Sequence, residues 1–386
     1  MKYIICHYGE IALKGKNRPF FENKLVKNIK KTLNKEKIDF VKRIFGRIII
    51  KLNKRVEKEE SEKFKNIFGV ANFSPAVKVK QNIEAIQKEA LNLLEKEDFK
   101  TFRITTKRAQ KDFPLNSQEI NEKVGAAVCK KLNKEVDLDN PDITCFIEIV
   151  QDLAFVYIKK IEGAKGLPVG VSGKAISLLS GGIDSPVASY LMLKRGIDPV
   201  YVHFHSYPYT DKASINKVEE LVKTLQKHQL QAKLYLVPFA EFQKRILDKV
   251  HEKYRIVLYR RFMYRVASKI AKKENAKCLI AGDSVGQVAS QTLENINAIS
   301  EVTDLPILRP LIGKDKVEIV NKAKEIGTYE ISIQPHEDAC SRFLPDHPET
   351  KTKIKNINKE EKNIDIEKEI EEIMGNIEIK NIENAN

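Results

Sequence analysis

The stretch SGGIDS at residues 180–185, followed at once by Pro186, decides the fold of this chain. An apolar run over 175–179 precedes it and predicts a strand, and the pattern over 186–195 predicts a helix. The two glycines let backbone N–H groups approach a phosphate closely, and a helix N-terminus adds partial positive charge. Ser185 suits the N-cap, and Pro186 suits the first helical position, where its missing N–H costs nothing. We therefore expect a phosphate-binding turn between a strand and a helix.

The residues after this turn alternate regularly between strand and helix patterns. Strands are expected over 199–204, 234–237 and 278–281. Helices are expected over 213–228 and, as one long or two shorter helices, over 239–271. Such alternation predicts a parallel sheet with helices on both faces. Because ligands of these folds bind at the carboxyl ends of the strands, the functional side chains should follow the strands.

The segment before this series carries two smaller patterns of strands and helices. A strand at 2–6, a helix at 20–33 and strands at 38–45 and 48–52 predict a small α+β unit. A second mixed series follows, and the glycine-rich stretch 163–173 is typical of a linker. The expected domains are residues 1–57, residues 58–165 and residues 166–386.

Composition excludes several classes of protein. The chain has 386 residues, of which 42% are hydrophobic, so it can bury ordinary cores and is not disordered throughout. No apolar run approaches the ~20 residues that span a bilayer, and the start lacks the apolar stretch of a signal peptide. We therefore expect a cytoplasmic protein without a membrane partner.

Charge and cysteine content narrow the class further. A net charge of +15, from 68 lysines and arginines against 53 acids, suits a polyanion such as nucleic acid. The five cysteines are scattered, odd in number and without a Cys-x-x-Cys pair. This spacing argues against a disulfide framework, a zinc ribbon and a cysteine-held iron–sulfur cluster.

The segment 351–386 is rich in Ile, Asn, Lys and Glu. Its pattern predicts one helix near 359–374, with Ile364, Ile370 and Ile373 as candidate docking residues. We expect this to be a peripheral helix with a frayed end.

Residues 180–185 resemble the PP-loop signature S-G-G-x-D-S of the ATP pyrophosphatase superfamily. Members of this superfamily cleave ATP between the α- and β-phosphates, transfer AMP to a substrate oxygen and release pyrophosphate. By this resemblance Asp184 would help to hold Mg²⁺, whose charge offsets the crowded phosphates. The residues that would cradle the departing pyrophosphate are Ser180, Gly181, Gly182, Asp184 and Ser185.

Three further segments resemble one family of that superfamily, the tRNA 4-thiouridine synthetases, which are tRNA sulfurtransferases. HYGEIALKGKNR at 7–18 resembles the family's N-terminal signature, and GDSVGQVASQT at 282–292 matches the family after the PP-loop. Residues from about 58 to 162 resemble a THUMP domain, an RNA-binding module. The implied fold is a PP-loop ATP pyrophosphatase domain of the α/β class, preceded by ferredoxin-like α+β and THUMP domains.

The same resemblance implies a reaction and its participants. ATP would adenylate the uridine at tRNA position 8, and sulfur would then replace its O4 to give 4-thiouridine. The resemblance also implies a homodimer that binds tRNA across its subunits. The residues expected to contact the rest of the nucleotide are Leu178, Leu179, His203, Phe204, Arg260, Gly282 and Gln291. The RNA-contact candidates are Tyr8, Lys14, Lys16, Arg18, Arg43, Arg47, Lys107, Arg108 and Lys111.

A pair of histidines and a pair of arginines near these residues can be explained by structure as well as by function. His203 and His205 would face the same side of a strand, which fits ordinary packing or a metal pair. Without nearby acids or cysteines we expect no metal site there. Arg261 and Arg265 lie four residues apart and should share one face of a helix.

Cys340 matches the family's sulfur-carrying cysteine in position and flanking residues. A cysteine thiol with a pKa near ~8.5 is partly ionised at neutral pH, and a thiolate or persulfide is a good nucleophile. The chain ends about 45 residues later, which leaves no room for the rhodanese domain that some members carry. We therefore expect a cysteine desulfurase to load Cys340 directly, and Cys6, Cys278 or an external reductant to resolve it. Sulfur supply to the thiamine thiazole is a weaker expectation without that domain.

Four other functions remain as alternatives, of which the cluster-dependent tRNA thiolases are disfavoured by the absence of a Cys-x-x-Cys pair. A PP-loop enzyme that transfers nitrogen shares the adenylation chemistry, but the sequence has no glutaminase-like region. A non-catalytic RNA-binding protein with a vestigial nucleotide loop is disfavoured by the intact motifs at 180–185 and 282–292. A THUMP methyltransferase is disfavoured because the glycine-rich loop is of the PP type.

Overall fold

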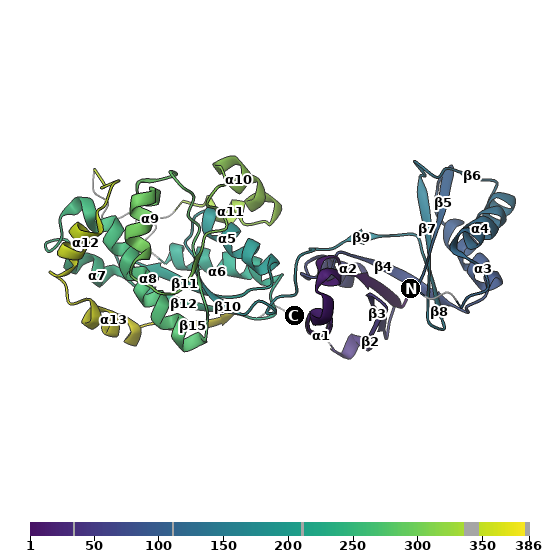
Figure 1. Ribbon diagram of the computed structural model, residues 1–386, viewed down its shortest axis with the longest axis horizontal. Coiled ribbons are helices and arrows are strands. Elements are labelled where there is room, and N and C mark those ends of the chain that lie inside the picture. The colour runs from purple at the N-terminus through teal and green to yellow at the C-terminus, as the bar shows by residue number, and fades with distance from the viewer. Residues whose placement is uncertain (34, 110–111, 210–211, 336–346, 383–386) are drawn as a thin grey trace. The chain divides into compact units, whose positions relative to one another are not determined.

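The computed structural model describes residues 1–33, 35–109, 112–209, 212–335 and 347–382. The chain divides into two compact units, Met1–Pro168 and Val169–Asn386, which we call unit 1 and unit 2 (Figure 1). The division falls inside the glycine-rich stretch 163–173. Among the described residues, no helix combines the length and the apolar character needed to cross a bilayer.

The described part of unit 2 is built on a six-stranded sheet. Its first five strands in spatial order run parallel to one another, and the sixth pairs antiparallel with its neighbour. In that order the strands are β14 (Ile307–Leu308), β13 (Leu279–Ile280), β10 (Lys174–Leu178), β11 (Asp198–His205), β12 (Ala232–Pro238) and β15 (Glu378–Ile382). The predicted parallel sheet is therefore confirmed, with one antiparallel edge strand added.

Alternating side chains of the central strands supply cores on both faces of this sheet. Ala175 and Ile280 belong to one core, whereas Ile176 and Leu279, their chain neighbours, belong to the other. On the first face lie α5 (Asp184–Lys194), α6 (Ala213–Gln226), α10 (Lys316–Glu325) and α11 (Tyr329–Ser332). On the second face lie α7 (Ala240–Ile246), α8 (Arg255–Glu274) and α9 (Leu293–Ser300). The stretch 239–271 thus forms two helices, and a short turn, η4 (Glu252–Tyr254), comes between them.

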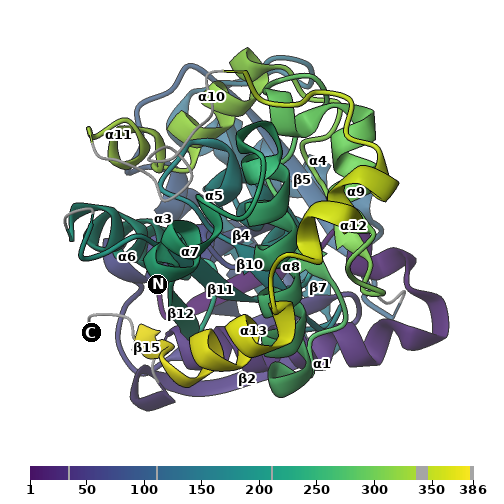
Figure 2. The ribbon, with the colours of Figure 1, turned by 90° about the vertical axis from the view of Figure 1, so that its left-hand side faces the viewer.

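The C-terminal segment differs from its prediction. Instead of one peripheral helix it forms α12 (Ile354–Glu361), α13 (Ile366–Gly375) and strand β15. Ile357, Ile370 and Ile373 are at most 5% exposed and pack in the same core as α8. Figures 1 and 2 show α12 and α13 (yellow) lying against α8 (green). The prediction of a single peripheral helix was wrong because isoleucines of both helices belong to the main core, whereas the prediction of Ile364, Ile370 and Ile373 as docking residues is confirmed.

A buried arginine joins this segment to the centre of unit 2. Arg261 of α8 is 1% exposed, and its guanidinium donates to both carboxylate oxygens of Glu361 at 2.9 Å. It also donates to Glu301 at 2.8 Å and to Asn358 at 2.7 Å. Arg265 binds the same Glu361 carboxylate at 2.7 and 2.9 Å. Arg261 and Arg265 do share a helix face, as predicted, and that face holds the C-terminal segment.

Unit 1 is built on a nine-stranded sheet in its described part. The strands are β1 (Tyr3–His7), β2 (Ile38–Ile44), β3 (Arg47–Leu52), β4 (Asn72–Val79), β5 (Thr101–Arg108), β6 (Glu135–Val136), β7 (Ile143–Val150), β8 (Leu153–Tyr157) and β9 (Ile161–Glu162). The spatial order is β2-β3-β1-β4-β8-β7-β5-β6, and β9 pairs with β4. The α-helices of this unit are α1 (Arg18–Thr32), α2 (Lys58–Lys65), α3 (Ile83–Leu94) and α4 (Ser117–Leu132).

Strand β4 is shared by both halves of unit 1. Its residues Asn72 to Ala76 pair with β1, and Val77 to Val79 pair with β8. The core of the second half is formed mainly by α3, α4 and strands β5 and β7. Because β4 belongs to both ladders, the two halves form one continuous sheet.

Removing the carboxylate of Glu361 should destabilise unit 2. In Glu361→Ala the buried Arg261 loses its bidentate partner, and breaking a buried ion pair from one side costs about 3–5 kcal/mol. Urea unfolding followed by circular dichroism should therefore show a lower midpoint. The exposed Glu371 of α13 supplies the matched control, Glu371→Ala, with an unchanged midpoint. Equal midpoints for the two variants would contradict the role given to Arg261.

Candidate functional site

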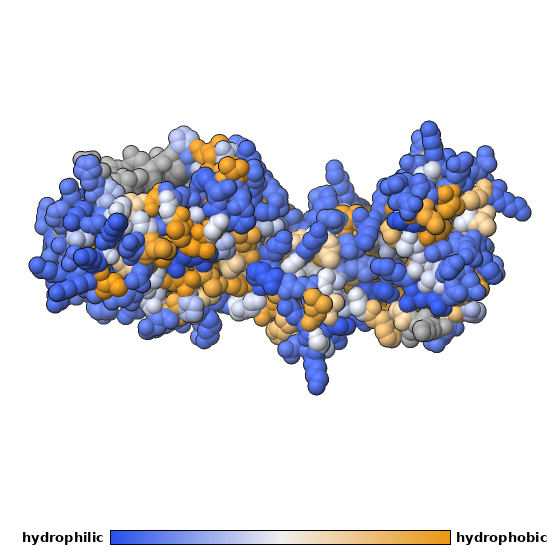
Figure 3. All heavy atoms as spheres, turned by 45° about the horizontal axis from the view of Figure 1, so that its top comes forward, coloured by the Kyte–Doolittle hydropathy of each residue, from blue (hydrophilic) through white to orange (hydrophobic). Residues whose placement is uncertain are grey.

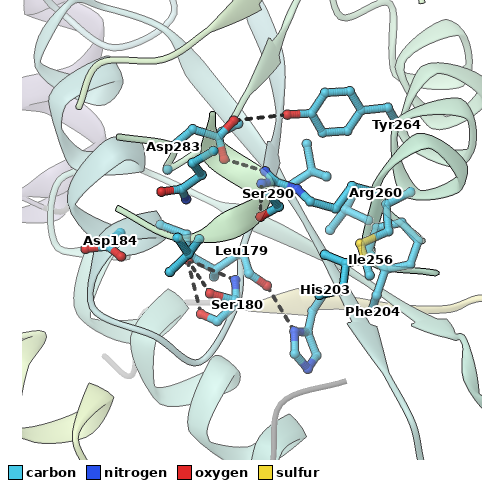
Figure 4. A pocket seen from close by; sticks show the side chains of 18 residues that line it. Leu179, Ser180, Asp184, His203, Phe204, Ile256, Arg260, Tyr264, Asp283 and Ser290 are labelled. Carbon is cyan, nitrogen blue, oxygen red and sulfur yellow. Dashed lines mark hydrogen bonds and ion pairs between the residues drawn. The ribbon is translucent and has the colours of Figure 1, made fainter. Parts of the chain in front are cut away.

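A pocket lies at the carboxyl ends of the parallel strands of unit 2. It has a volume of about 420 Å³, within the range of small-molecule sites. The chain reverses its direction across the sheet between β10 and β13, because β11 follows on one side of β10 and β13 on the other. The carboxyl ends of the strands at such a reversal are where α/β sheets bind ligands. Figure 4 shows side chains from β10, β11, α8 and the segment after β13 converging there.

The loop between β10 and α5 forms one wall of this pocket. The Ser185 hydroxyl accepts from the Ser180 N–H at 2.9 Å and lies 3.1 Å from the Ser180 hydroxyl. Helix α5 begins at Asp184, so the prediction of Ser185 as N-cap and Pro186 as first helical residue was wrong by two positions. Pro186 is tolerated there because the first-turn N–H groups have no partner within the helix. In the described chain no side chain caps this helix, and its first two residues, Asp184 and Ser185, line the pocket. An uncapped helix N-terminus at a pocket is suited to bind an anion.

Asp184 brings a carboxylate to this wall. Its two oxygens accept from Lys316 Nζ at 2.7 Å and from Gln287 Nε2 at 2.9 Å. Lys316 is the first residue of α10, and Gln287 lies in the segment after β13. The carboxylate is therefore oriented from two sides.

Gly282 is required by a close approach of two backbones. A Cβ atom at this position would lie 2.9 Å from the Ser185 backbone N and 3.0 Å from its Cα. Such distances are shorter than any ordinary Cβ contact, so a larger residue would push the segment after β13 away from the start of α5. Glycine here keeps the two walls of the pocket together.

The opposite wall holds a network of opposite charges. Arg260 of α8 donates to Asp283 Oδ1 and, at 3.2 Å, to the Ser290 hydroxyl (Figure 4). The other oxygen of Asp283 accepts from Arg309 Nε at 3.0 Å and from the Tyr264 hydroxyl at 3.3 Å. Burial alone would raise the pKa of Asp283, but Arg260 and Arg309 hold that pKa below its usual range. Two cations against one anion leave this wall with a net positive charge.

The two histidines of β11 are buried side by side, with ring centroids 6.5 Å apart. His203 Nδ1 lies 2.9 Å from the carbonyl oxygen of Leu179. Burial, with a smaller contribution from His203, lowers the pKa of His205 to about 4, so His205 is neutral at pH 7. Among the described residues, no cluster of three or more His, Cys, Asp or Glu side chains has the arrangement of a metal site.

The structure brings most of the predicted nucleotide-site residues to this one pocket. The predicted residues that line it are Leu178, Leu179, Ser180, Asp184, Ser185, His203, Phe204, Arg260, Gly282 and Gln291. Gly181 and Gly182 belong to the same loop but are not among the lining residues. Cys340 lies outside the described residues.

Sequence reasoning missed several residues of this pocket. On α8, Ile256, Met263 and Tyr264 line it together with Arg260. They lie three or four residues from Arg260, which places them on one face of the helix. They could therefore have been predicted from Arg260, because residues at this spacing share a helix face. The role of Lys316 had no such signal, because it lies 132 residues from Asp184.

The predicted RNA-contact residues of unit 1 differ in their surroundings. Lys14, Lys16 and Arg18 lie in or just after two short turns, η1 (Glu10–Leu13) and η2 (Gly15–Asn17), formed by the N-terminal signature. Lys16, Arg43 and Lys107 are exposed. Figure 3 shows a largely hydrophilic surface on the face of unit 1 that it displays.

Other members of that set are held by contacts within unit 1. Tyr8 is 7% exposed, and its hydroxyl donates to Glu22, which also accepts from Arg43 at 3.1 Å. The Arg108 guanidinium donates to two backbone carbonyls, at 2.7 and 3.1 Å. Lys111 lies outside the described residues.

Arg47 is buried rather than presented on the surface. It is 9% exposed, and its Nε lies 2.9 Å from Glu148 Oε2. Glu148, itself 1% exposed, also accepts from Tyr157 at 2.6 Å and pairs with His7 at 2.9 Å. This cluster joins β1 and β3 to β7 and β8. Arg47 therefore forms an ion pair between the two halves of unit 1.

The fold and the pocket together define a PP-loop α/β protein that carries a ferredoxin-like domain and a THUMP domain. The family model "Thiamine biosynthesis protein (ThiI)" matches residues 170–366. The model "ThiI ferredoxin-like domain" matches residues 3–74, and the model "THUMP domain" matches residues 80–159. This chain belongs to the ThiI family.

Relatives and solved structures of this family match over nearly the whole chain. A protein of Thermoanaerobacter sp. (strain X514) named "Probable tRNA sulfurtransferase" is 45% identical, covering 95% of this chain and 97% of its own length. A protein of Brevibacillus brevis with the same name is 42% identical, covering 98% and 96%. The structure titled "Crystal structure of a 4-thiouridine synthetase - RNA complex with bound ATP" has a TM-score of 0.91 at 39% identity, covering 99% of this chain and 100% of that one.

Adding one methyl group at position 282 should separate the walls of the pocket. In Gly282→Ala the new Cβ would clash with the start of α5, so the anion site there should be distorted. We expect the affinity for inorganic pyrophosphate, measured by calorimetry, to fall by roughly tenfold or more, a loss of about 1.4 kcal/mol. Gly313→Ala is the matched control, since a Cβ there meets no atom within 4 Å. Equal affinities of both variants would refute the close-approach argument.

The stability of unit 1 should depend on pH through Glu148. Burial alone would raise its pKa, but His7, Arg47 and Tyr157 lower it from 4.5 to about 2. The unfolded chain then binds more protons than the folded one between these values, so the stabilisation is complete above pH 4.5 and is lost toward pH 2. The loss is on the order of 3 kcal/mol.

Denaturant unfolding of the wild type and of Glu148→Gln at several pH values tests this. The wild type should lose stability steeply between pH 4.5 and 2, whereas the variant should show a flatter profile and lower stability at pH 7. The exposed Glu84 of α3 provides the control Glu84→Gln. Parallel pH profiles for wild type and Glu148→Gln would contradict the assignment.

Proposed function

We propose that this chain is an ATP-dependent tRNA sulfurtransferase that converts the uridine at position 8 of tRNA into 4-thiouridine. The observation that carries the proposal is the pocket at the strand reversal, with an uncapped helix N-terminus on one wall and Arg260 on the other. Full-length likeness to proteins named tRNA sulfurtransferase supports the reaction class. The 4-thiouridine synthetase structure contains ATP and RNA, which supports both as substrates here.

The pocket residues have distinct tasks in the adenylation step. The backbone donors of the loop at 180–185 bind the β- and γ-phosphates, which leave as pyrophosphate when the uridine O4 attacks the α-phosphorus. Arg260 meets the negative charge that builds up on the phosphates, and Asp283 and Ser290 hold its guanidinium in place. The adenosine rests against Leu178, Leu179 and Phe204 at the strand ends.

Asp184 is the residue suited to hold Mg²⁺. Of the two acidic side chains among the described lining residues, Asp283 is paired with two arginines away from the phosphate loop, whereas Asp184, paired with one lysine, lies at that loop. Mg²⁺ is bound in such sites by one or two carboxylates together with phosphate oxygens and water. When bound, the ion neutralises phosphate charge. Lys316 and Gln287 orient the carboxylate for this task.

Cys340 carries the sulfur in the second step. A cysteine desulfurase loads it as a persulfide, and the terminal sulfur attacks C4 of the adenylated uridine while AMP leaves with the former O4. A thiol then attacks the inner sulfur, which breaks the S–S bond and releases 4-thiouridine with a new disulfide on the protein or reductant.

The described cysteines fit that resolving role poorly. Cys6 is fully buried in β1 of unit 1, and burial raises the pKa of its thiol. Cys278 precedes β13, at the amino end of the strand, whereas the pocket lies at the carboxyl ends. Burial raises its pKa as well. An external reductant therefore fits better than either thiol.

Unit 1 is proposed to hold the tRNA. The exposed cations Lys16, Arg43 and Lys107 are free of the burial that removes Arg47 from this set. Neutralising phosphates with such cations gives an affinity that falls with salt. A cytoplasmic homodimer, with tRNA held by one subunit and modified by the other, completes the proposal.

One assay tests the proposed function directly. The protein is incubated with unmodified tRNA, Mg²⁺, ATP and a desulfurase with cysteine, and the digested tRNA is examined by mass spectrometry. We expect 4-thiouridine that depends on ATP, and no 4-thiouridine from Cys340→Ser, which should still release pyrophosphate. Pyrophosphate without thiouridine in the wild type would point to nitrogen transfer or another acceptor. Neither product would favour a non-catalytic RNA-binding protein.

A further inference from the structure

An arginine behind the pocket wall shares a carboxylate with Arg260. Arg309 directly follows β14, and Asp283 lies three residues beyond the end of β13. Because β13 and β14 are neighbouring parallel strands, both residues start from the carboxyl ends of the sheet, where the pocket lies. Arg309 Nε donates to Asp283 Oδ2 at 3.0 Å, and the two side chains are 14% and 4% exposed. The ion pair is therefore mostly shielded from water.

The second oxygen of Asp283 has no lone pair left for Arg260. A carboxylate oxygen has two lone pairs, and those of Oδ2 accept from Arg309 and, at 3.3 Å, from the Tyr264 hydroxyl. Arg260 Nη2 binds the other oxygen, Oδ1, and its Nη1 donates to the Ser290 hydroxyl at 3.2 Å (Figure 4). The Arg260 guanidinium is thus divided between a carboxylate and a hydroxyl.

The far side of the Arg309 guanidinium is also held. Its Nη2 donates at 2.7 Å to the hydroxyl of Ser300, the last residue of α9. The carboxyl end of a helix carries partial negative charge, which favours a cation there. The Ser300 hydroxyl in turn donates to the carbonyl oxygen of Ile296 at 2.5 Å, so its orientation is set by its own helix. Arg309 is therefore fixed between α9 and Asp283.

These contacts decide how much charge the wall presents. Arg260 and Arg309 carry two positive charges and Asp283 one negative charge, which leaves a net charge of +1. Among the described residues, Arg260 and Asp283 line the pocket and Arg309 does not. Without Arg309, Asp283 would neutralise Arg260, and the freed lone pair of Oδ2 would allow the two-bond pairing that arginine and carboxylate favour. The wall would then present a neutral ion pair.

We propose that Arg309 is a positioning residue that shares Asp283 with Arg260 and thereby keeps the Arg260 charge available to the phosphates of the nucleotide. This inference deepens the proposed function and rests on it, because it concerns ATP in the same pocket. A neutral ion pair attracts an anion far less than a cation does, so a phosphate-binding arginine must not be fully paired before the ligand arrives. Arg309 meets this requirement through Asp283 and without lining the pocket.

Binding of three adenine ligands tests the proposal. Adenosine, AMP and ATP carry rising negative charge, and their affinities are measured by equilibrium dialysis without added Mg²⁺. In Arg309→Met the affinity for adenosine should stay within about twofold of wild type, whereas that for AMP should fall several-fold and that for ATP by roughly tenfold or more. Lys277→Met is the matched control, because it removes one exposed charge at the amino end of β13, opposite the pocket. All three affinities of this control should equal those of wild type.

Further variants separate charge from packing. Arg309→Lys keeps the charge and a donor for Asp283, so it should retain most of the affinity for ATP. The double variant of Arg309→Met with Asp283→Asn restores the net charge of +1 through Arg260 alone, so it should bind ATP more tightly than Arg309→Met. A role in packing predicts instead that the second substitution weakens binding further. Ser300→Ala removes only an acceptor of Arg309, and it should give smaller losses in the same order of ligands even if Arg309→Met does not fold.

The outcomes that would overturn the proposal are distinct. They are equal losses of affinity for the three ligands in Arg309→Met or Ser300→Ala, an unchanged affinity of Arg309→Met for ATP, and a double variant that binds ATP no better than Arg309→Met. Each of these, in a protein whose wild type binds ATP, would refute this inference alone. A wild type that bound none of the three ligands would refute the proposed function and this inference together.

Discussion

The contact between two backbones at Gly282 and Ser185 is the constraint on which the site depends. A Cβ atom at position 282 would lie 2.9 Å from the Ser185 nitrogen, so the segment after β13 has no room for a side chain there. This contact brings the end of β13 against the start of α5. The pocket lies at the carboxyl ends of the paired strands β10 and β13, where the chain reverses its direction across the sheet. Asp184 on one wall and Arg260 on the other then face the same volume.

Buried charges link this site to parts of the chain far away in sequence. On α8, Arg260 points to the pocket, and its neighbour Arg261 holds Glu361 of the C-terminal segment. Helix α8 thus contributes Arg260 to the pocket and Arg261 to the stability of the core. In unit 1 the cluster around Glu148 has a similar role, since it joins strands of both halves. In each case a charge that sequence reading treats as surface is satisfied inside the protein.

Local sequence signals predicted most of the fold. The strand, the glycine turn and the helix around 180–185 carry their own propensities, and apolar periodicity identified the parallel sheet. The signals failed where the partner is distant. The pattern predicted Ile370 as a docking residue but not that it would pack in the core of α8, and nothing near Arg47 indicates a buried carboxylate 101 residues later at Glu148. Resemblance supplied many of the residues that line the pocket. It did not supply Asp283, nor Lys316 beside the pocket, whose importance comes from contacts across the sheet ends.

Strand β15 has a consequence for the synthesis of the protein. It pairs with β12 along residues 232–236, yet it is made more than a hundred residues later. Until the ribosome has released residues 378–382, β12 is an open edge strand, and the isoleucines of α12 and α13 have not yet closed the core. A nascent chain in this state exposes a strand edge and apolar surface, which is the form that chaperones bind and that aggregates. The order of synthesis therefore lets unit 2 complete its folding only after residue 382 has left the ribosome.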